Sequence, residues 1–166
     1  AENTCLELAR FYGIYDRMVQ DIDDSTEYSI GPRGNTSQQF DLYFKSVDST
    51  YTRFSYDGQV ELDYSVWTEN RVFVFEAKSY TTHGLDIGWH KLAFPCQRFI
   101  DLVEEYGLTV NPVYFLRTQI QGKNVILLYV FKEMKYQDKG LILNDKERWK
   151  LLQVYKLSLD EINMVL

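Results

Sequence analysis

The sequence contains little cysteine, little proline and no long apolar run. Its 166 residues include two Cys and three Pro, and no segment approaches the ~18 consecutive apolar residues of a membrane-spanning helix. A disulfide-rich secreted domain would need more cysteines at close spacing, so we interpret Cys5 and Cys96 as reduced thiols. The first residues carry acids and lack the basic and apolar regions of a secretory signal. We therefore expect an intracellular, cytoplasmic protein without a membrane partner.

Positive charge is also scarce. The chain has 18 Lys and Arg against 24 Asp and Glu, which gives a formal net charge of −6. Nucleic-acid binding normally depends on basic residues that neutralise phosphates, so this balance predicts weak and salt-sensitive binding to nucleic acid. The basic residues that we expect to cluster lie in the second half of the chain, at Lys91, Arg98, Lys123, Lys132, Lys135 and Lys139.

Apolar and aromatic residues, by contrast, are abundant, at 45% and 16% of the chain. That is enough to bury one core, and the length is typical of one domain. We expect a single domain over residues 1–166, with a core at about 1–132 and a C-terminal helical extension at about 140–166. The chain shows no internal repeat and no low-complexity tract.

The spacing of apolar residues predicts both helices and strands. The predicted helices cover residues 3–22, 87–106, about 145–153 and 158–165. The predicted strands cover residues 40–47, 50–56, 59–67, 71–79, 112–120 and 124–134. The polar, glycine-containing residues 23–39 are predicted to form a loop. This order indicates an α/β protein, specifically an α/β/α sandwich in which helices flank a central mixed sheet.

The segment "VFVFEAKS", residues 72–79, places two charges at the end of the most apolar extended run in the chain. A charge on a strand that is covered on both faces is costly unless it is paired, hydrogen-bonded or bound to a metal. Glu76 and Lys78 therefore need partners, and because they are two residues apart they share one face of the strand.

The preceding strand offers those partners. Glu61 and Asp63 are also two residues apart and share a face. If Glu69-Asn70 is a two-residue turn, Asp63 lies directly across from Glu76, and Glu61 lies across from Lys78. A three-residue turn would place the two sets on opposite faces, unless a bulge restores the alternation.

The facing carboxylates of Asp63 and Glu76 indicate a cation site. Two carboxylates so close repel, so they would share a proton or bind a divalent cation. Oxygen ligands from these acids and from the Ala77 carbonyl favour Mg²⁺ or Mn²⁺. Lys78 is then placed to orient a water or to stabilise charge on a phosphate oxygen. The alternative is an ordinary salt-bridge ladder of Glu61, Asp63 and Lys78 on an exposed face.

An acid on one strand followed after twelve residues by Glu76-Ala77-Lys78 on the next resembles the PD-(D/E)xK nuclease superfamily. The upstream helix, the antiparallel hairpin, and the helix and strand that follow are similar as well, so the resemblance covers about residues 1–132. It departs from the family in having Leu62, rather than Pro, before Asp63. The resemblance implies a restriction-endonuclease-like fold, Mg²⁺ held by Asp63 and Glu76, a water assisted by Lys78, and hydrolysis of phosphodiester bonds, most often in DNA.

Further site residues are expected around this centre. By the same resemblance, Glu7 in the first helix would be a metal ligand and Gln97 in the following helix would contact the substrate. His83 follows the motif strand and Lys91 lies in the next predicted helix, so both are candidates to contact substrate; the alternative for each is an ordinary loop or helix residue. A second Glu-x-Lys, residues 133–135, follows a strand that has no acid-bearing partner.

A different class of function also fits. The aromatic-rich residues 40–56 lie outside the motif and are suited to a partner surface or a homodimer interface. Together with the acidic charge, they favour a non-catalytic protein that keeps a nuclease-like fold as a binding or assembly module.

Overall fold

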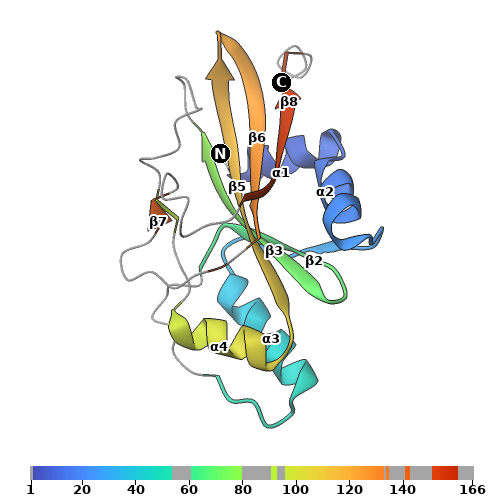
Figure 1. The fold of residues 1–166 in the computed structure, drawn as a ribbon, viewed down its shortest axis with the longest axis vertical. Coiled ribbons are helices and arrows are strands. Elements are labelled where there is room, and N and C mark those ends of the chain that lie inside the picture. The colour runs from blue at the N-terminus through green and yellow to red at the C-terminus, as the bar shows by residue number, and fades with distance from the viewer. Residues whose placement is uncertain are drawn as a thin grey trace.

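The computed structural model describes residues 2–53, 61–79, 91–92, 96–132, 134, 141–142 and 151–160. Its centre is a six-stranded sheet in the order β1-β2-β3-β5-β6-β8 (Figure 1). These strands are β1 (Ser29–Ile30), β2 (Tyr64–Trp67), β3 (Arg71–Ser79), β5 (Thr109–Ile120), β6 (Lys123–Phe131) and β8 (Leu151–Ser158). A separate two-stranded sheet pairs β4 (Lys91–Leu92) with β7 (Leu141–Ile142). The helices are α1 (Glu2–Phe11), α2 (Ile14–Asp23), α3 (Thr36–Val47) and α4 (Gln97–Glu105).

The six-stranded sheet is mixed. Strands β3 and β5 run parallel, and the other neighbouring pairs run antiparallel. A parallel pair needs a crossover connection, and α4 lies in the chain between β3 and β5. The expectation of an α/β protein with a mixed sheet is therefore confirmed.

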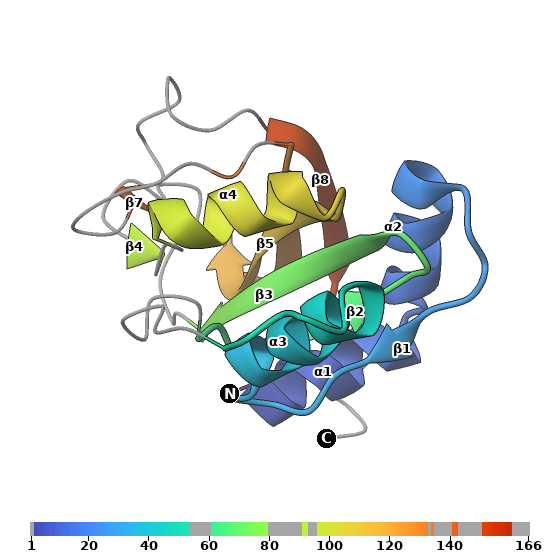
Figure 2. The same ribbon diagram turned by 90° about the horizontal axis from the view of Figure 1, so that it is seen from below.

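Helices pack against both faces of the sheet at β3. Phe73, Phe75 and Ala77 contribute to one core together with residues of α1 and α2. Val72 and Val74 contribute to a second core with residues of α3 and α4, and Figure 2 shows these two helices alongside β3. The alternation along β3 explains why this strand is apolar at every position from 72 to 75.

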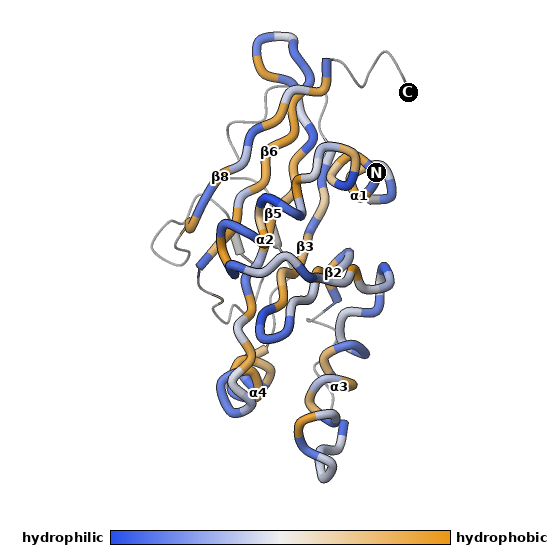
Figure 3. Tube along the Cα trace, turned by 90° about the vertical axis from the view of Figure 1, so that its right-hand side faces the viewer, coloured by the Kyte–Doolittle hydropathy of each residue, from blue (hydrophilic) through white to orange (hydrophobic). Residues whose placement is uncertain are grey.

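A third core covers β5 and β6 further along the sheet. It contains Tyr114, Leu116, Val125, Leu127, Tyr129 and Phe131. Figure 3 shows hydrophobic residues along β5 and β6 and hydrophilic residues at the turn between them. That turn is formed by Gln121 and Gly122, which both have positive φ (52° and 76°), as a two-residue hairpin turn requires. The strands predicted at 112–120 and 124–134 are thus confirmed in their described residues through Phe131.

The predicted helix over residues 3–22 is two helices. The chain leaves α1 after Phe11 and enters α2 at Ile14, and Gly13 between them adopts a left-handed conformation with φ 63°. The apolar spacing continues across this break, which is why the pattern predicted one helix. The break lets α1 and α2 contribute side chains to the same core from different directions.

Gly13→Ala is expected to lower the free energy of unfolding by about 1–2 kcal/mol, because a residue with a Cβ is strained in the left-handed region. A Cβ at this position would make only an ordinary contact, with the nearest atom, Asp16 Oδ2, at 3.4 Å, so the loss reports the backbone conformation. Denaturant unfolding measures it. The control Gln38→Ala, at an exposed position in α3, should change the same free energy by less than ~0.5 kcal/mol.

The strand predicted at 40–47 is wrong, because these residues belong to α3. Phe40 and Phe44 are four residues apart and both lie fully buried against Phe99 of α4, at ring-centroid distances of 4.7 and 6.3 Å. Spacing by four is helical, whereas the aromatic composition favoured a strand. The predicted loop 23–39 is also wrong in part. Strand β1 lies within these residues, and their last part forms the first turn of α3. Residues 51–53 are not in a strand, and residues 54–60 lie outside the described part of the chain.

Two further predictions of helix are wrong in part, although α4 (Gln97–Glu105) confirms the end of the predicted helix 87–106. Residues 91–92 of the predicted helix 87–106 are extended in β4, and α4 begins only at Gln97, two residues after a proline. Residues 151–153 of the predicted helix 145–153 belong to β8, an outer strand of the six-stranded sheet. Tyr155 and Leu159 enter the core that contains α1 and α2. The described part of the C-terminal extension is therefore sheet, because its apolar residues meet β6. The predicted helix 158–165 lies largely outside the described residues.

Within the described residues, we find no helix with the length and apolar character needed to cross a membrane.

Candidate metal site at the end of strand β3

The hairpin of β2 and β3 has the two-residue turn that the sequence predicts. Its paired residues run from Tyr64 with Phe75 to Trp67 with Val72, and the Thr68 amide donates to the Arg71 carbonyl at 2.8 Å. Glu69 and Asn70 thus form this turn. The regular pairing ends at Tyr64, one residue before Asp63.

The ladder between the two strands ends at this point in an unusual way. In a regular continuation, Leu62 and Ala77 would exchange two backbone hydrogen bonds. Instead, the Ala77 amide donates to Oδ2 of Asp63 at 2.7 Å, and the Leu62 amide donates to Oγ1 of Thr36 at 3.0 Å. Side-chain oxygens therefore take the place of both backbone acceptors.

Asp63 is held by its backbone as well. Its amide donates to the Phe75 carbonyl at 2.9 Å, although that carbonyl faces Tyr64 in the register, and its own carbonyl accepts the Gly34 amide at 2.9 Å. This local shift has the character of a β-bulge, which re-aims a side chain and ends strand pairing. With the bond to Ala77, three hydrogen bonds fix the position of the Asp63 carboxylate.

Glu76 and Lys78 form an ion pair on the same face. Oε1 of Glu76 lies 3.2 Å from Nζ of Lys78, and their side chains are 16% and 40% exposed. In the parallel register with β5, they lie beside Tyr114 and Leu116, which are both buried. Glu76 is therefore a mostly buried carboxylate, and Lys78 extends from it towards solvent. An ion pair on an exposed surface, by contrast, contributes little to the stability of the fold.

The Ala77 carbonyl belongs to the same edge of β3. In a strand, the N–H and C=O of one residue point towards the same neighbour, so this carbonyl shares the edge on which the Ala77 amide meets Asp63. The small Ala77 side chain lies on the opposite face of the sheet from Glu76, in the core with α1 and α2. The Asp63 carboxylate, which accepts the Ala77 amide, the Ala77 carbonyl and the neighbouring Glu76 carboxylate are oxygen donors, the type that Mg²⁺ and Mn²⁺ prefer.

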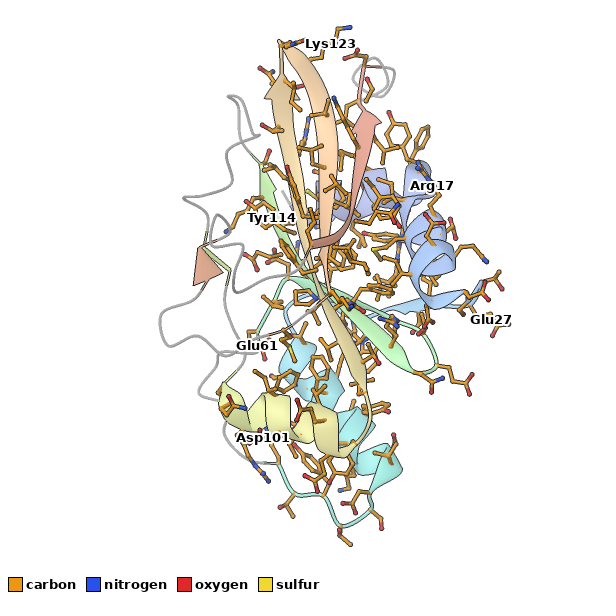
Figure 4. All side chains as sticks on the ribbon, viewed as in Figure 1. Arg17, Glu27, Glu61, Asp101, Tyr114 and Lys123 are labelled. Atoms are coloured by element: carbon orange, nitrogen blue, oxygen red, sulfur yellow. The ribbon has the colours of Figure 1, made fainter. Side chains whose placement is uncertain are left out.

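The alternative salt-bridge ladder between Glu61 and Lys78 does not form. Glu61 precedes β2 and is exposed, and its Oε1 accepts a hydrogen bond from the Ser37 hydroxyl of α3. The shift at Asp63 ends the regular register before Glu61 is reached, so these two charges do not face one another. Figure 4 shows Glu61 between the sheet and the helices α3 and α4.

The structure does not bring Glu7 or Gln97 to this site. Glu7 is exposed on α1, and α1 packs on the opposite face of the sheet from Glu76. Gln97 is exposed at the start of α4, and its Nε2 donates to Asp101 Oδ1 on the same helix at 3.0 Å. In Figure 4, Asp101 on α4 lies well away from Tyr114, the neighbour of Glu76 on β5.

The two remaining candidates are placed only in part. Lys91 lies in β4, where it pairs with Ile142 of β7. His83 lies outside the described residues. Within the residues that are described, no group of three or more His, Cys, Asp or Glu side chains is arranged to hold a metal ion. The candidate metal ligands are two carboxylates and a carbonyl, and Mg²⁺ usually keeps several waters as its other ligands.

Tyr64, next to Asp63 in the chain, does not contribute an acid or base. Its side chain belongs to the core with α1 and α2, where its hydroxyl accepts a hydrogen bond from the Tyr15 hydroxyl at 2.9 Å. Burial raises the pKa of Tyr64 well above its ordinary value of 10.0. This phenol therefore stays neutral.

Thr36 and Gly34 were missed by the reading of the sequence, which assigned both to a loop. Asn35, a residue type favoured before the first turn of a helix, precedes Thr36 and is the signal that marks the start of α3. Thr36 contacts residue 62 and Gly34 contacts residue 63, at separations of 26 and 29 positions in the chain. Contacts between such distant residues leave no local pattern in the sequence.

The chain belongs to a family described as a domain of unknown function (DUF6997), whose model matches residues 1–147. The matched range includes the whole hairpin that carries Asp63, Glu76 and Lys78. No curated protein and no solved structure matches the chain.

Proposed function

We propose that the protein is a Mg²⁺- or Mn²⁺-dependent nuclease that hydrolyses phosphodiester bonds, with DNA as its substrate. The observation that carries the proposal is the end of the β2–β3 ladder, where the Asp63 carboxylate binds the Ala77 amide beside Glu76 and Lys78. The order of elements supports it, because an antiparallel hairpin is followed by α4 and by a strand parallel to β3. This order is similar to that of the PD-(D/E)xK, restriction-endonuclease-like domains that the motif resembles.

The residues have separate roles in this proposal. Asp63, Glu76 and the Ala77 carbonyl would hold the ion, which when bound supplies a Lewis acid for the phosphate and lowers the pKa of water. Lys78 orients the attacking water and stabilises negative charge that develops on a phosphate oxygen. The mostly buried position of Glu76 strengthens these electrostatic interactions, since water screens them less.

Substrate binding should be weak and sensitive to salt. The net charge of −6 repels DNA at long range. Lys123 and Lys132, which were expected to cluster, lie at opposite ends of β6, and Figure 4 shows Lys123 at the far tip of the sheet. Most of the local attraction for phosphate then comes from the bound cation and Lys78, because a divalent cation offsets the charge of the two acids.

The test is cleavage of linear double-stranded and single-stranded DNA by the full chain with Mg²⁺ or Mn²⁺, and with EDTA as the control. We expect cleavage in the presence of the ion and none with EDTA. Calorimetric titration with MnCl₂ should show binding to the folded protein. Absence of both cleavage and Mn²⁺ binding in a folded protein would overturn the nuclease proposal.

One observation favours the second candidate, a non-catalytic binding or assembly module. Helix α3 exposes two large apolar side chains, Leu42 and Val47, with 64% and 53% of their surfaces accessible. Exposed apolar side chains on a helix are suited to a protein partner or to a homodimer. A folded protein that binds no Mn²⁺ but self-associates in sedimentation would support this candidate.

A further inference from the structure

The first residue of α3, Thr36, is fully buried and contacts the segment that carries Asp63. Its exposed fraction is 0%, and its Oγ1 accepts the Leu62 amide at 3.0 Å. A threonine at the start of a helix normally turns its hydroxyl towards its own helix or towards solvent. Oγ1 of Thr36 instead accepts a backbone amide 26 residues away in sequence.

This hydrogen bond holds the bulge at Asp63 in place. In a regular ladder, the Leu62 amide would donate to the Ala77 carbonyl. Because the bulge inserts one residue at Asp63, the Leu62 amide points away from β3 instead. Thr36 accepts this amide and so ties the bulged segment to α3.

The chain between β1 and α3 reinforces the same geometry. The Gly31 amide donates to the Ser65 carbonyl at 2.8 Å, and the Gly34 amide donates to the Asp63 carbonyl at 2.9 Å. Residues 31–36 therefore run beside residues 62–65 and hold them at three points. Helix α3 is itself anchored in the core with Val72 and Val74 of β3, so Thr36 occupies a fixed position relative to this strand.

We propose that Thr36 is a positioning residue for the cation site. Its hydroxyl holds the bulged segment before β2 and so fixes the Asp63 carboxylate beside the Ala77 amide, at the edge of β3 where this carboxylate and the Ala77 carbonyl would bind one hard divalent cation. The inference rests on the proposed function, since it assumes that this edge binds the ion. It adds a residue outside the acid and lysine motif on which the affinity for the ion depends.

The test compares Thr36→Val with Thr36→Ser in the full chain. Valine keeps the volume but lacks the acceptor, whereas serine keeps the hydroxyl. We expect Thr36→Val to weaken Mn²⁺ binding about 10- to 100-fold, the usual effect of removing a group that orients a metal ligand, and Thr36→Ser to bind like the wild type. Titration with MnCl₂ measures the affinity. Cleavage by Thr36→Val should recover at high Mn²⁺ concentration, where the weakened site is filled.

Thr68→Val is the matched control. The Thr68 hydroxyl also accepts a backbone amide, that of Arg71 at 3.1 Å, at the other end of the same hairpin. This variant should bind Mn²⁺ like the wild type. Should Thr36→Val fail to fold, Thr36→Cys replaces it, because a thiol has a similar size but accepts hydrogen bonds weakly.

The outcomes separate this inference from the proposed function. Wild-type Mn²⁺ affinity in Thr36→Val or Thr36→Cys, together with loss of binding in Asp63→Asn, would overturn the role of Thr36 and leave the metal site intact. Wild-type affinity in Asp63→Asn and in Glu76→Gln would overturn both. Equal weakening in Thr36→Val and Thr68→Val would show a general effect on the hairpin and would also overturn the role of Thr36.

Discussion

Replacing Lys78 by Met is expected to lower the rate of DNA cleavage about 10²- to 10⁴-fold while tightening Mn²⁺ binding. In the structure the ammonium lies 3.2 Å from the Glu76 carboxylate, so a cation that binds Glu76 must compete with it. The same ammonium repels the incoming ion. A single and a double positive charge about 5 Å apart repel by roughly 1–2 kcal/mol in a water-like dielectric, so we expect affinity to rise about five- to thirtyfold.

Glu76→Gln should behave differently, because it removes a ligand of the ion. We expect at least ~100-fold weaker Mn²⁺ binding, since even the loss of a group that only orients a ligand costs 10- to 100-fold, and no measurable cleavage at micromolar Mn²⁺. The contrast between the two variants assigns the roles: both lose cleavage, and only one loses the ion. Titration with MnCl₂ and initial rates at saturating Mn²⁺ supply the two readouts.

Glu69→Gln is the control for both variants. Glu69 is exposed in the turn at the other end of the hairpin, so its substitution should leave affinity and rate unchanged. If Lys78→Met retained wild-type cleavage, Lys78 would have no part in the chemistry. If Glu76→Gln retained the affinity for Mn²⁺, the ion would bind elsewhere and the proposed site would be wrong.

The register of the β2–β3 hairpin could be predicted because it depends on local features. The two-residue turn at Glu69-Asn70 and the alternation of side chains along a strand fix the pairing of the two strands. Both lie within one hairpin, so a count of residues is sufficient. The shift at Asp63 could not be predicted in the same way, because it arises from contacts with Gly34 and Thr36 in a distant segment.

The failed predictions share a physical cause. The aromatic residues at 40–47 have the composition of a strand but the spacing of a helix, and packing against α4 selects the helix. The residues that form β8 are apolar at Leu151, Leu152 and Val154 and were assigned to helix in part. They are extended because β6 offers a free edge that β8 pairs with. In both cases a tertiary partner, absent from the local pattern, decides the conformation.

Truncation of Phe75 is expected to have the largest effect on stability. Phe75 is fully buried, its ring stacks on Tyr64 at a centroid distance of 4.6 Å, and it meets Tyr15 edge-on at 5.6 Å. Phe75→Ala should lower the free energy of unfolding by about 3–5 kcal/mol, because it removes this contact area and leaves a cavity that the surrounding rings cannot fill. Denaturant unfolding followed by circular dichroism measures the change. Phe11→Ala is the matched control, since Phe11 is 72% exposed, and should cost less than ~0.5 kcal/mol.

The same variant also separates the fold from the site. Phe75 holds Asp63 through its backbone carbonyl, and that carbonyl remains in Phe75→Ala. The fraction of Phe75→Ala that is folded should therefore bind Mn²⁺ with nearly the affinity of the wild type, although its unfolding midpoint falls. A loss of stability no larger than that of Phe11→Ala would contradict the packing of Phe75 between Tyr15 and Tyr64. A loss of Mn²⁺ affinity in the folded fraction would mean that the aromatic core, in addition to the backbone of β3, sets the position of the Asp63 carboxylate.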